Sequence, residues 1–592
     1  MRRLQTILSA IAVWLLSPAF FPLAVTAQPA SDSVQISPLV PRLSPLYRDY
    51  HTLKRSDPWL TSSNAAALVR FVADNIAEAQ LSLTGRKGGH TDYYDSPDVR
   101  QADAAIESFF RLSPRTVVFG SMSYHNFSGR DMAGSAFIPP LGEESGVSYL
   151  PSSLGGIRGG LPFDLIEDSL TNTGTKHRDT YSLSGGFGYN VSEGFAVGAR
   201  LDYTSANYAK YKDLRHKNKL MDMQLTLGAD LPLGRWGAVG ANYLYHRTTE
   251  SVQFSTYGKT DRTYQTLISY AAFMGRVEQF GGTGYTDKSR EMPLVSDYNG
   301  VGAQFALFFS PLTFYNGFTY AHRTGYYGRR SPYTVTYADH HSDLYSYDAR
   351  LTLDTRRSRF SLDLQLRAEN LQNLAATYRE QKNDAGASYY DYYTPVKTAD
   401  KLWVDGTVAL TADIPLFGGW VAEGQDGSEK LPRGGMALPS WTFQAGLSWH
   451  HRHHTAYLYP YYRRQRLTVY EPFVSVTRSI LSPRGNALWS FTLDGSFRQG
   501  TGDASEDLTF VEPSDKQEPP ATMDAYLWRE YQWLAAPQYA VGGTVKYAFM
   551  LPFTQLRPHV GFSLHHRKAN QTYPYSSGRD RSEAVFTLGC TF

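Results

Sequence analysis

The densest group of side chains that could bind a metal ion is the run His450-His451-Arg452-His453-His454. Neutral imidazole is a good ligand for transition metals and for haem iron. If the run is a β-strand, His450 and His454 share one face and lie about 13 Å apart, because a strand rises about 3.3 Å per residue. One metal ion could bind both only where the chain turns. We therefore favour a polar surface without a bound metal or other cofactor, and keep a metal or haem site at His450 and His454 as the alternative.

Charged side chains form the second group of candidates, because they recur inside segments in which polar and apolar residues alternate. They would then lie together on the polar face of neighbouring strands. One interpretation, which we favour, is a network of mutually paired charges that stiffens the interior. The other is a lining that selects a hydrophilic solute, although the mixed signs argue against strong selectivity for anions or cations. The candidates for this lumen lining are Arg200, Asp202, Asp222, Asp230, Asp348, Arg350, Asp354, Asp363, Arg367, Glu369, Asp494 and Arg498.

No spacing of residues points to catalysis, so we do not expect an enzyme. Single Asp, Ser and His residues are common, but they form no recognisable triad. Ser184-Gly185-Gly186 and Gly281-Gly282 lack the strand, glycine loop and helix of a phosphate-binding motif. The net charge of +3, spread over interspersed basic and acidic residues, gives no indication of a nucleic-acid partner. The single cysteine, Cys590, excludes an intrachain disulfide.

The elements that carry these residues are predicted to be membrane-spanning β-strands. From Lys219 to Leu233, apolar residues occupy every second position, and polar residues such as Asp222 and Asp230 stand between them. A strand that crosses a membrane needs about ten residues with this alternation, and its backbone groups must pair with neighbouring strands. We count about 18 such segments. The sequence therefore predicts an all-β fold, a transmembrane antiparallel β-barrel of about 18 strands, with a range of about 16–18.

The connections between these strands are predicted to alternate in length. Tight or moderate turns lie near Ser113-Pro114, Ser192-Glu193, Gly234-Arg235, Ser310-Pro311, Arg356-Arg357, Gly418 to Gly434, Pro483 to Gly485 and Leu551-Pro552. The other connections are mostly longer, especially around 128–179, 251–299, 371–399 and 500–536. Outer-membrane barrels have short periplasmic turns and long extracellular loops. We therefore predict that the chain lies in the outer membrane of a two-membraned bacterium.

The N-terminus has the pattern of a secretory signal peptide. Arg2 and Arg3 precede a mostly apolar run from Ile7 to Ala24, and small residues stand just before Gln28. Residues 1–27 are therefore predicted to be removed on export. No later segment approaches the roughly 20 apolar residues of a spanning helix.

Two further domains are expected after the signal peptide. Residues 28–78 are predicted to form a periplasmic N-terminal segment, with a helix from Asn64 to Ala77. The alternative is that this segment enters the lumen as a partial plug. Residues 79–592 are predicted to form the barrel itself.

The last strand ends at Phe592 and has the pattern of a membrane-insertion signal. Phe586, Leu588, Cys590 and Phe592 alternate along one apolar face. Such a strand resembles the signal that the barrel-assembly machinery reads, so we expect this machinery as a partner. The lipid bilayer and lipopolysaccharide are expected partners too, with lipopolysaccharide phosphates meeting Arg452 and protonated histidines at the outer rim.

Several short motifs resemble an uncharacterised family of Bacteroidota outer-membrane β-barrels, a group of unknown function. The resemblance extends over most of the chain after the signal peptide and brings no known activity or catalytic residue. It implies that the protein works alongside TonB-linked uptake systems, which would make iron or haem acquisition a candidate role. The motifs are Asp57-Pro58-Trp59-Leu60, Ser108-Phe109-Phe110-Arg111-Leu112, Phe119 to Tyr124, Lys212-Asp213-Leu214-Arg215 and Gly284-Tyr285-Thr286-Asp287.

Transport is the leading functional prediction: a porin-like pore, or an accessory barrel of a TonB-linked nutrient system that binds a TonB-dependent receptor or a surface lipoprotein. The alternative is a structural or adhesin-like surface platform that binds a protein or glycan through its extracellular loops. Runs such as Tyr389-Tyr390-Asp391-Tyr392-Tyr393 suit such a surface, because tyrosine and arginine are favoured at interfaces. An open lumen would favour transport, and a lumen packed by paired charges and loops would favour the platform.

Overall fold

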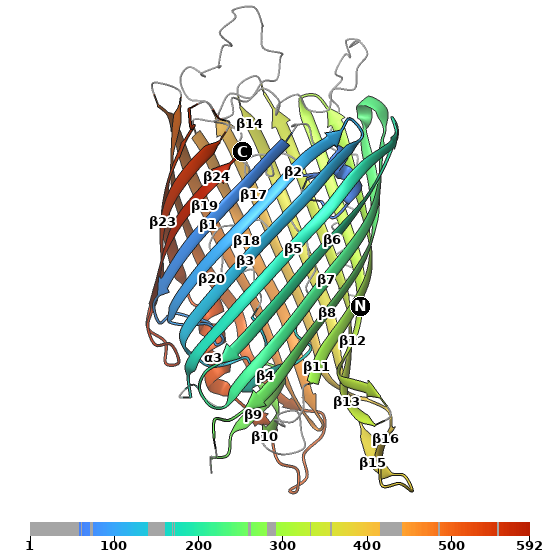
Figure 1. The fold of residues 1–592 in the computed structure, drawn as a ribbon. Coiled ribbons are helices and arrows are strands. Elements are labelled where there is room, and N and C mark those ends of the chain that lie inside the picture. Colours follow the sequence, from blue (N-terminus) through green and yellow to red (C-terminus); the bar gives the residue numbers. More distant parts are fainter. Residues whose placement is uncertain are drawn as a thin grey trace, which may run out of the picture. The chain divides into compact units, whose positions relative to one another are not determined.

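The chain folds into one closed barrel of 18 antiparallel strands, as the sequence predicts (Figure 1). The barrel closes because the first strand, β1 (Asn75–Lys87), pairs with both β2 (Asp98–Ser113) and the last strand, β24 (Asp580–Thr591). The predicted signal peptide lies outside the residues that this computed structural model describes. These residues are 58–60, 62–70, 75–139, 160–167, 170, 172–258, 262–280, 292–331, 333–355, 358–414, 441–482, 486–552, 554 and 556–592.

The other wall strands follow in chain order, and each is antiparallel to its neighbours. Most are considerably longer than the ten or so residues that a bilayer requires, so the wall extends beyond the membrane. Their bounds are β3 (Thr116–Met132), β5 (Gly174–Ser192), β6 (Phe195–Lys210), β7 (Arg215–Pro232), β8 (Gly237–Ser255), β11 (Met292–Phe309), β12 (Leu312–Ser331), β13 (Thr334–Asp354), β14 (Arg359–Ala375), β17 (Val396–Ile414), β18 (Trp441–Leu458), β19 (Tyr461–Leu481), β20 (Ala487–Thr509), β22 (Gln538–Phe549) and β23 (Arg557–Ala569).

The alternation of residues along each strand fixes which side chains face out. In β7, Leu225 and Leu227 are exposed on the outer face, whereas Thr226 and Asp230 are buried on the inner face. A strand has a side-chain period of two, so a shift of one residue would place all of these leucines in the lumen. The apolar outer surface and the closed ladder of hydrogen bonds are those of an outer-membrane barrel.

The connections divide the barrel into two different ends. The predicted turns all join strands at the end where β24 finishes, which we call the turn end. Four of these turns lie wholly or partly outside the described residues, but the strands on both sides of each are described. The opposite end, which we call the loop end, is at the bottom of Figure 1. Its longest connections follow β3, β8, β14 and β20, close to the predicted loops.

Strands from three of the loops at the loop end pair to form one small sheet, which we did not predict from the sequence. It has the order β21-β10-β9-β4. We call this sheet and the helix α3 the crossbar. Its elements are β4 (Asp164–Glu167), β9 (Gln265–Ala271), β10 (Met274–Gln279), β21 (Ala521–Thr522) and α3 (Asp524–Ala535).

Another loop carries the hairpin β15 (Tyr378–Lys382) and β16 (Ser388–Tyr392), which projects away from the barrel (Figure 1). Among the described residues, no helix is both long and apolar enough to cross a membrane.

At the turn end, the residues before β1 pack against the inner face of the wall. The predicted helix Asn64–Ala77 is wrong in its second half, because a 3-10 helix, η2, covers only Ala65–Arg70 and Asn75 already begins β1. Helix η2 contacts β5, β6 and β7. The approach is so close that a Cβ on Gly228 would lie 2.0 Å from the Oδ1 atom of Asn64.

Candidate functional site: the lumen and the crossbar

The twelve predicted lumen residues all have a partner of opposite charge or a histidine partner. Six of them pair with one another. The Arg200 Nε atom lies 2.9 Å from Asp202 Oδ2, and an Arg367 nitrogen lies 3.0 Å from Asp348 Oδ1. The third pair joins Arg350 to Asp363 across β13 and β14. These six residues therefore form three ion pairs along or between neighbouring strands.

The other six residues pair with side chains that were not predicted. The Asp354–Arg359 pair was the easiest to find from the sequence, because the two residues flank a predicted turn and face each other across it. Asp222–His246 and Arg498–Glu471 also lie on the two strands of one hairpin, and the other partners come from more distant parts of the chain. The pairs are Asp222–His246 at 2.8 Å, Asp230–Arg70 at 2.6 Å, Asp354–Arg359 at 2.6 Å, Glu369–Arg323 at 3.2 Å, Asp494–His565 at 3.5 Å and Arg498–Glu471 at 2.6 Å.

One part of the inner wall remains open to solvent. The side chain of Asp405 is 54% exposed on β17, on the face opposite to the apolar Leu410. The side chains of Asp348 and Arg367, on β13 and β14, are 39% and 35% exposed. Residues on the inner face of a closed barrel reach solvent only inside the lumen. The wall formed by β13, β14 and β17 therefore lines a wet space with charges of both signs.

The two ends of the histidine run lie in different surroundings. His450 Nδ1 lies 2.5 Å from Asp405 Oδ1, whereas His454 is buried with its ring edge-on to Trp403. No group of three or more His, Cys, Asp or Glu side chains in the described parts of the chain is placed to hold a metal ion.

The expectation that Arg452 meets lipopolysaccharide phosphates at the rim is wrong. Arg452 is buried, and its guanidinium lies 2.6 Å from the carboxylate of Glu530 on α3. Simple alternation along β18 placed Arg452 on the inner face, but no pattern in the sequence indicated that a helix from another loop would reach it there.

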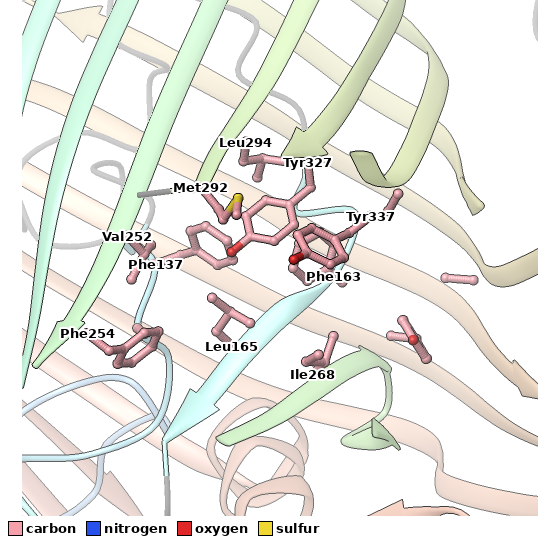
Figure 2. Packing of buried hydrophobic residues seen from close by; sticks show 14 of the residues in the cluster. Phe137, Phe163, Leu165, Val252, Phe254, Ile268, Met292, Leu294, Tyr327 and Tyr337 are labelled. Carbon is pink, nitrogen blue, oxygen red and sulfur yellow. The ribbon is translucent and has the colours of Figure 1, made fainter. Parts of the chain in front are cut away.

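The crossbar fills the lumen at the loop end with an apolar cluster. Figure 2 shows Phe163, just before β4, among Tyr327, Met292 and Leu294 of the wall. The rings of Phe163 and Tyr327 are 5.0 Å apart, and both side chains are almost completely buried. Apolar packing at this density excludes water, so the loop end of the lumen is closed there.

The β4 end of the crossbar is held by a buried cluster of charges. The Glu167 carboxylate lies 2.5 Å from the Lys176 amine, contacts Lys210 as well, and lies 3.3 Å from His216. These four side chains are at most 3% exposed. Burial by itself would raise the pKa of Glu167, but the charges of Lys176 and Lys210 outweigh it and hold this pKa well below its usual range.

Backbone and side-chain hydrogen bonds reinforce the β4 end. The Glu167 amide donates to Gly134 O at 3.0 Å. Asp164 accepts hydrogen bonds from the Ser135 hydroxyl at 2.6 Å and the Tyr93 hydroxyl at 2.9 Å. Burial raises the pKa of Asp164, although these two hydroxyls oppose the shift. Just before β4, the Lys401 amine donates to Leu161 O at 2.8 Å, which ties the same segment to β17.

The α3 end of the crossbar is attached to β18 and β19 by ion pairs and to β20 by the Tyr531 hydroxyl, which donates to Gly502 O at 2.7 Å. Arg463 binds Asp507 at 2.5 Å and Asp524 at 2.7 Å, and these two carboxylates are 63% and 53% exposed. Arg452 and Glu530 form the better-shielded pair. Apolar contact with the wall is small on this side, where Ala535 meets Leu467 and Val469.

The last turn of α3 ends in a basic and aromatic contact. Trp533 has the guanidinium groups of Arg498 and Arg581 at 5.6 and 5.7 Å from its ring centroid. The ring of His90, in the loop after β1, lies 4.9 Å from that of Trp533 and makes a 3.2 Å hydrogen bond with Gln538. Burial, with smaller contributions from nearby arginines, lowers the pKa of His90 to about 4.

The residues of the predicted insertion signal lie at the seam of the barrel. Phe586, Leu588 and Phe592 are exposed on the outer face. Phe586 and Leu588 stand opposite Leu83 and Leu81 of β1. The backbone of Phe592 exchanges two hydrogen bonds with Ala77, so the terminal residue takes part in closing the wall.

Comparison with known proteins identifies one family and several barrels of low similarity. A family model described as a family of unknown function (DUF6850) matches residues 170–592. No curated protein sequence matches the chain. Among solved structures, the outer-membrane transporter YddB from Escherichia coli is 9% identical with a TM-score of 0.37, covering 88% of this chain and 81% of that one. BauA, the ferric preacinetobactin receptor from Acinetobacter baumannii, is 8% identical with a TM-score of 0.36, covering 87% and 80%. Similarity at this level identifies no ligand.

Proposed function

The chain belongs to the family of unknown function DUF6850, and from its geometry we propose that it transports a hydrophilic solute across the outer membrane. In this proposal the solute passes through the lumen, and the protein's own loops close that lumen in the resting state. The observation that carries the proposal is the solvent-exposed wall of paired charges at Asp348, Arg367 and Asp405, inside a barrel whose loop end is shut.

The composition of this wall supports a polar solute of low net charge. Carboxylates and guanidinium groups stand side by side, so neither sign dominates and neither anions nor cations are strongly excluded. A barrel of 16–18 strands is wide enough for an aqueous channel. The loops that pack the loop end match what we expected of a platform, but the solvent-exposed charges of Asp348, Arg367 and Asp405 favour transport.

The closed ends support a gated conduit rather than a permanently open pore. The crossbar fills the loop end with apolar side chains. At the turn end, the residues around η2 act as a partial plug, because Arg70 pairs with Asp230 and Asn64 bonds to the wall at Ala229 O and Gln304. A solute could pass only after both segments move.

The remaining parts of the proposal come from the sequence. The signal peptide directs export, the turn end faces the periplasm, and the loop end faces the exterior. The barrel-assembly machinery inserts the chain, and a TonB-dependent receptor or surface lipoprotein of a Bacteroidota uptake system is the expected partner. Iron or haem acquisition is the expected role of such a system.

Conductance in planar bilayers tests the proposed function. The wild-type protein should be nearly silent. A variant in which a short Gly-Ser linker replaces residues 512–535 lacks α3 and should conduct strongly and admit small sugars in a liposome-swelling assay. The matched control replaces residues 379–391 in the same way, which removes the β15–β16 hairpin outside the lumen and should leave conductance at the wild-type level. A folded variant without α3 that remains silent would overturn the proposal.

A second candidate function is a docking platform at the loop end. The β15–β16 hairpin projects from the barrel and exposes Tyr389 and Tyr392, with Tyr393 just beyond it (Figure 1). Tyrosine supplies stacking area for sugars and for protein side chains at little entropic cost. The hairpin-deletion control provides the test: loss of binding of whole cells to a glycan array or a partner lipoprotein, with the barrel intact, would support it. Unchanged binding would argue against it.

A further inference from the structure

We propose that the crossbar is a gate that opens at its α3 end, while its β4 end stays attached and serves as the pivot. This inference rests on the proposed transport function, because it names the part of the molecule that regulates the lumen. It derives from the different ways in which the two ends of the crossbar are held.

The two ends of the crossbar are attached to opposite parts of the wall. The β4 end is held by Lys176, Lys210 and His216, on β5, β6 and β7. The α3 end is held by β18, β19 and β20. In one direction the two groups are separated by β8, β11, β12, β13, β14 and β17. In the other direction they are separated by β22, β23, β24, β1, β2 and β3. Six strands lie on each side, so the crossbar spans the lumen.

The crossbar has an apolar core of its own, so it can move as a unit. Tyr526 and Leu527 of α3 pack with Leu267 of β9 and Ile166 of β4. The Tyr526 hydroxyl also donates to Glu167 O at 3.1 Å. Helix α3 is therefore joined to the sheet both by apolar packing and by a hydrogen bond. A force that detaches α3 from the wall would carry the sheet with it.

The pivot is the end where apolar packing and buried charge act together. The cluster around Phe163 and Tyr327 fastens the chain beside β4 to the wall (Figure 2). Withdrawal of Glu167 would leave two buried amines, Lys176 and Lys210, without their counter-charge. Removing one partner from a buried ionic cluster is strongly unfavourable. The β4 end therefore stays in place in any opening that preserves the fold.

The α3 end is the part that water and ions can release. Asp507 and Asp524 share the single guanidinium of Arg463, and both carboxylates are more than half exposed. Exposed ion pairs are weak and are screened by salt. Asp524 can exchange Arg463 for water when α3 moves, whereas Glu530 is only 13% exposed, so its pair with Arg452 is the main ionic contact that opening must break. Opening disrupts the apolar packing of Tyr531, Leu534 and Ala535 against the wall, and the hydrogen bond that Arg529 donates to Thr91.

Hydrogen exchange of the intact protein in detergent or nanodiscs tests the order of opening. Amides of α3 should exchange at least ~tenfold faster than those of β4 and β9. The double variant Asp524→Asn/Glu530→Gln should speed exchange of α3 by about a further tenfold and should raise the frequency of channel openings. Glu506→Gln is the matched control: Glu506 forms an exposed ion pair with Arg464 at 3.2 Å on the same strands, and its loss should change neither measurement.

A disulfide that locks the α3 end provides the complementary test. A Cβ on Gly500 would lie 2.6 Å from the Cα and 2.7 Å from the Cβ of Ala535, so α3 must move away by roughly 1 Å before Gly500→Cys and Ala535→Cys can form a disulfide. The background is Cys590→Ser, which removes the only native thiol. The oxidised protein should lose all openings, and a reductant should restore them.

Failure of the gate inference can be told apart from failure of the transport proposal. If β4 exchanges before α3, or if the double variant leaves α3 exchange unchanged, the gate inference is wrong whatever the conductance. If α3 exchanges early and responds to the double variant but neither this variant nor the α3 deletion conducts, the mobile α3 end stands and transport is overturned. Openings that persist in the oxidised, locked protein also contradict the gate.

Discussion

The two ends of the crossbar use ion pairs for opposite purposes. Glu167, buried with Lys176 and Lys210, cannot leave without exposing an unbalanced charge to a dry interior. Asp524 can leave Arg463 and find water at once, because its side chain is already half exposed. The comparison shows that burial decides whether an ion pair is a permanent attachment or a releasable one. Four predictions test this difference.

The largest effect is expected at the buried cluster. Glu167→Gln should lower the stability of the barrel by roughly 3–5 kcal/mol, because two buried amines lose their counter-charge. Thermal unfolding, followed by the shift of the heat-modifiable band on gels, measures this loss. Glu167→Asp keeps the charge and should be milder. An unchanged melting temperature in the Gln variant would show that the β4 end does not depend on the cluster.

The apolar side of the pivot should matter almost as much. Phe163→Ala removes a ring that packs against Tyr327 in the dry part of the lumen, and should destabilise the crossbar by about 3 kcal/mol. The expected result is faster exchange of β4 and β9, with little change in the wall strands. Phe163→Leu fills most of the volume and serves as the control. If the amides of β4 and β9 exchange equally fast in both variants, the apolar cluster does not contribute to holding the β4 end.

Acidification should loosen the α3 end before the β4 end. Burial holds the pKa of His90 near 4, so this ring is neutral in the closed state. When α3 moves, His90 regains a pKa near 6.5, and its protonation favours the open state as the pH falls from about 6.5 to about 4. One proton changes the opening equilibrium by up to about tenfold per pH unit in this window. Arginines that face His90 and disfavour its charge in the closed state are Arg498, Arg567 and Arg581.

The carboxylate of Glu167 should behave differently from the His90 ring over the same pH range. Its pKa is held well below the usual range, so it stays ionised throughout that window, and because burial raises the pKa of Asp164, protonation there favours the attached state and the β4 end should not loosen. Hydrogen exchange of the α3 and β4 amides, measured at several pH values, tests both expectations in one experiment. His90→Gln should abolish the response of α3. A pH dependence that survives this substitution would assign the titration to another group.

The smallest effect on stability is expected at the exposed pair. Asp524→Asn should change the unfolding free energy by about 1 kcal/mol or less. The same substitution should make channel opening less sensitive to salt, since screening has one fewer pair to weaken. Conductance at low and high ionic strength measures this. If Asp524→Asn lowered the stability as much as Glu167→Gln, the two ends would be held equally strongly and the proposed difference would be wrong.

Much of the wall could be predicted from the sequence because its rules are local. A period of two along segments such as Lys219–Leu233 identifies a strand and its two faces, and turn residues such as Ser310-Pro311 mark where it reverses. The strand number and the positions of the turns follow from these signals. Charge pairs across a turn, such as Asp354 and Arg359, can be predicted in the same way, because the two residues are close in the sequence.

The crossbar could not be predicted, because its contacts are not local. The β4 strand has only four residues, and the sequence gives no indication that Glu167 meets Lys210 and His216 from two wall strands. Helix α3 lies in a loop that we treated as external. We expected Arg452 to be exposed at the rim. Because this helix contacts it, Arg452 is buried and holds the helix. Long-range packing of loops into a cavity leaves no periodic pattern in a single sequence.

The seam between β1 and β24 joins the two ends of the barrel domain. These two strands come from opposite ends of the chain, and their pairing is what turns the sheet into a tube. Residues 62–70 come before β1 and touch the inner surface at Ala229, Asp230 and Gln304. The chain therefore passes within a few residues from the segment in the lumen to the strand that closes the wall, so loss of the hydrogen bonds between Ala77 and Phe592 would loosen the wall beside the plug.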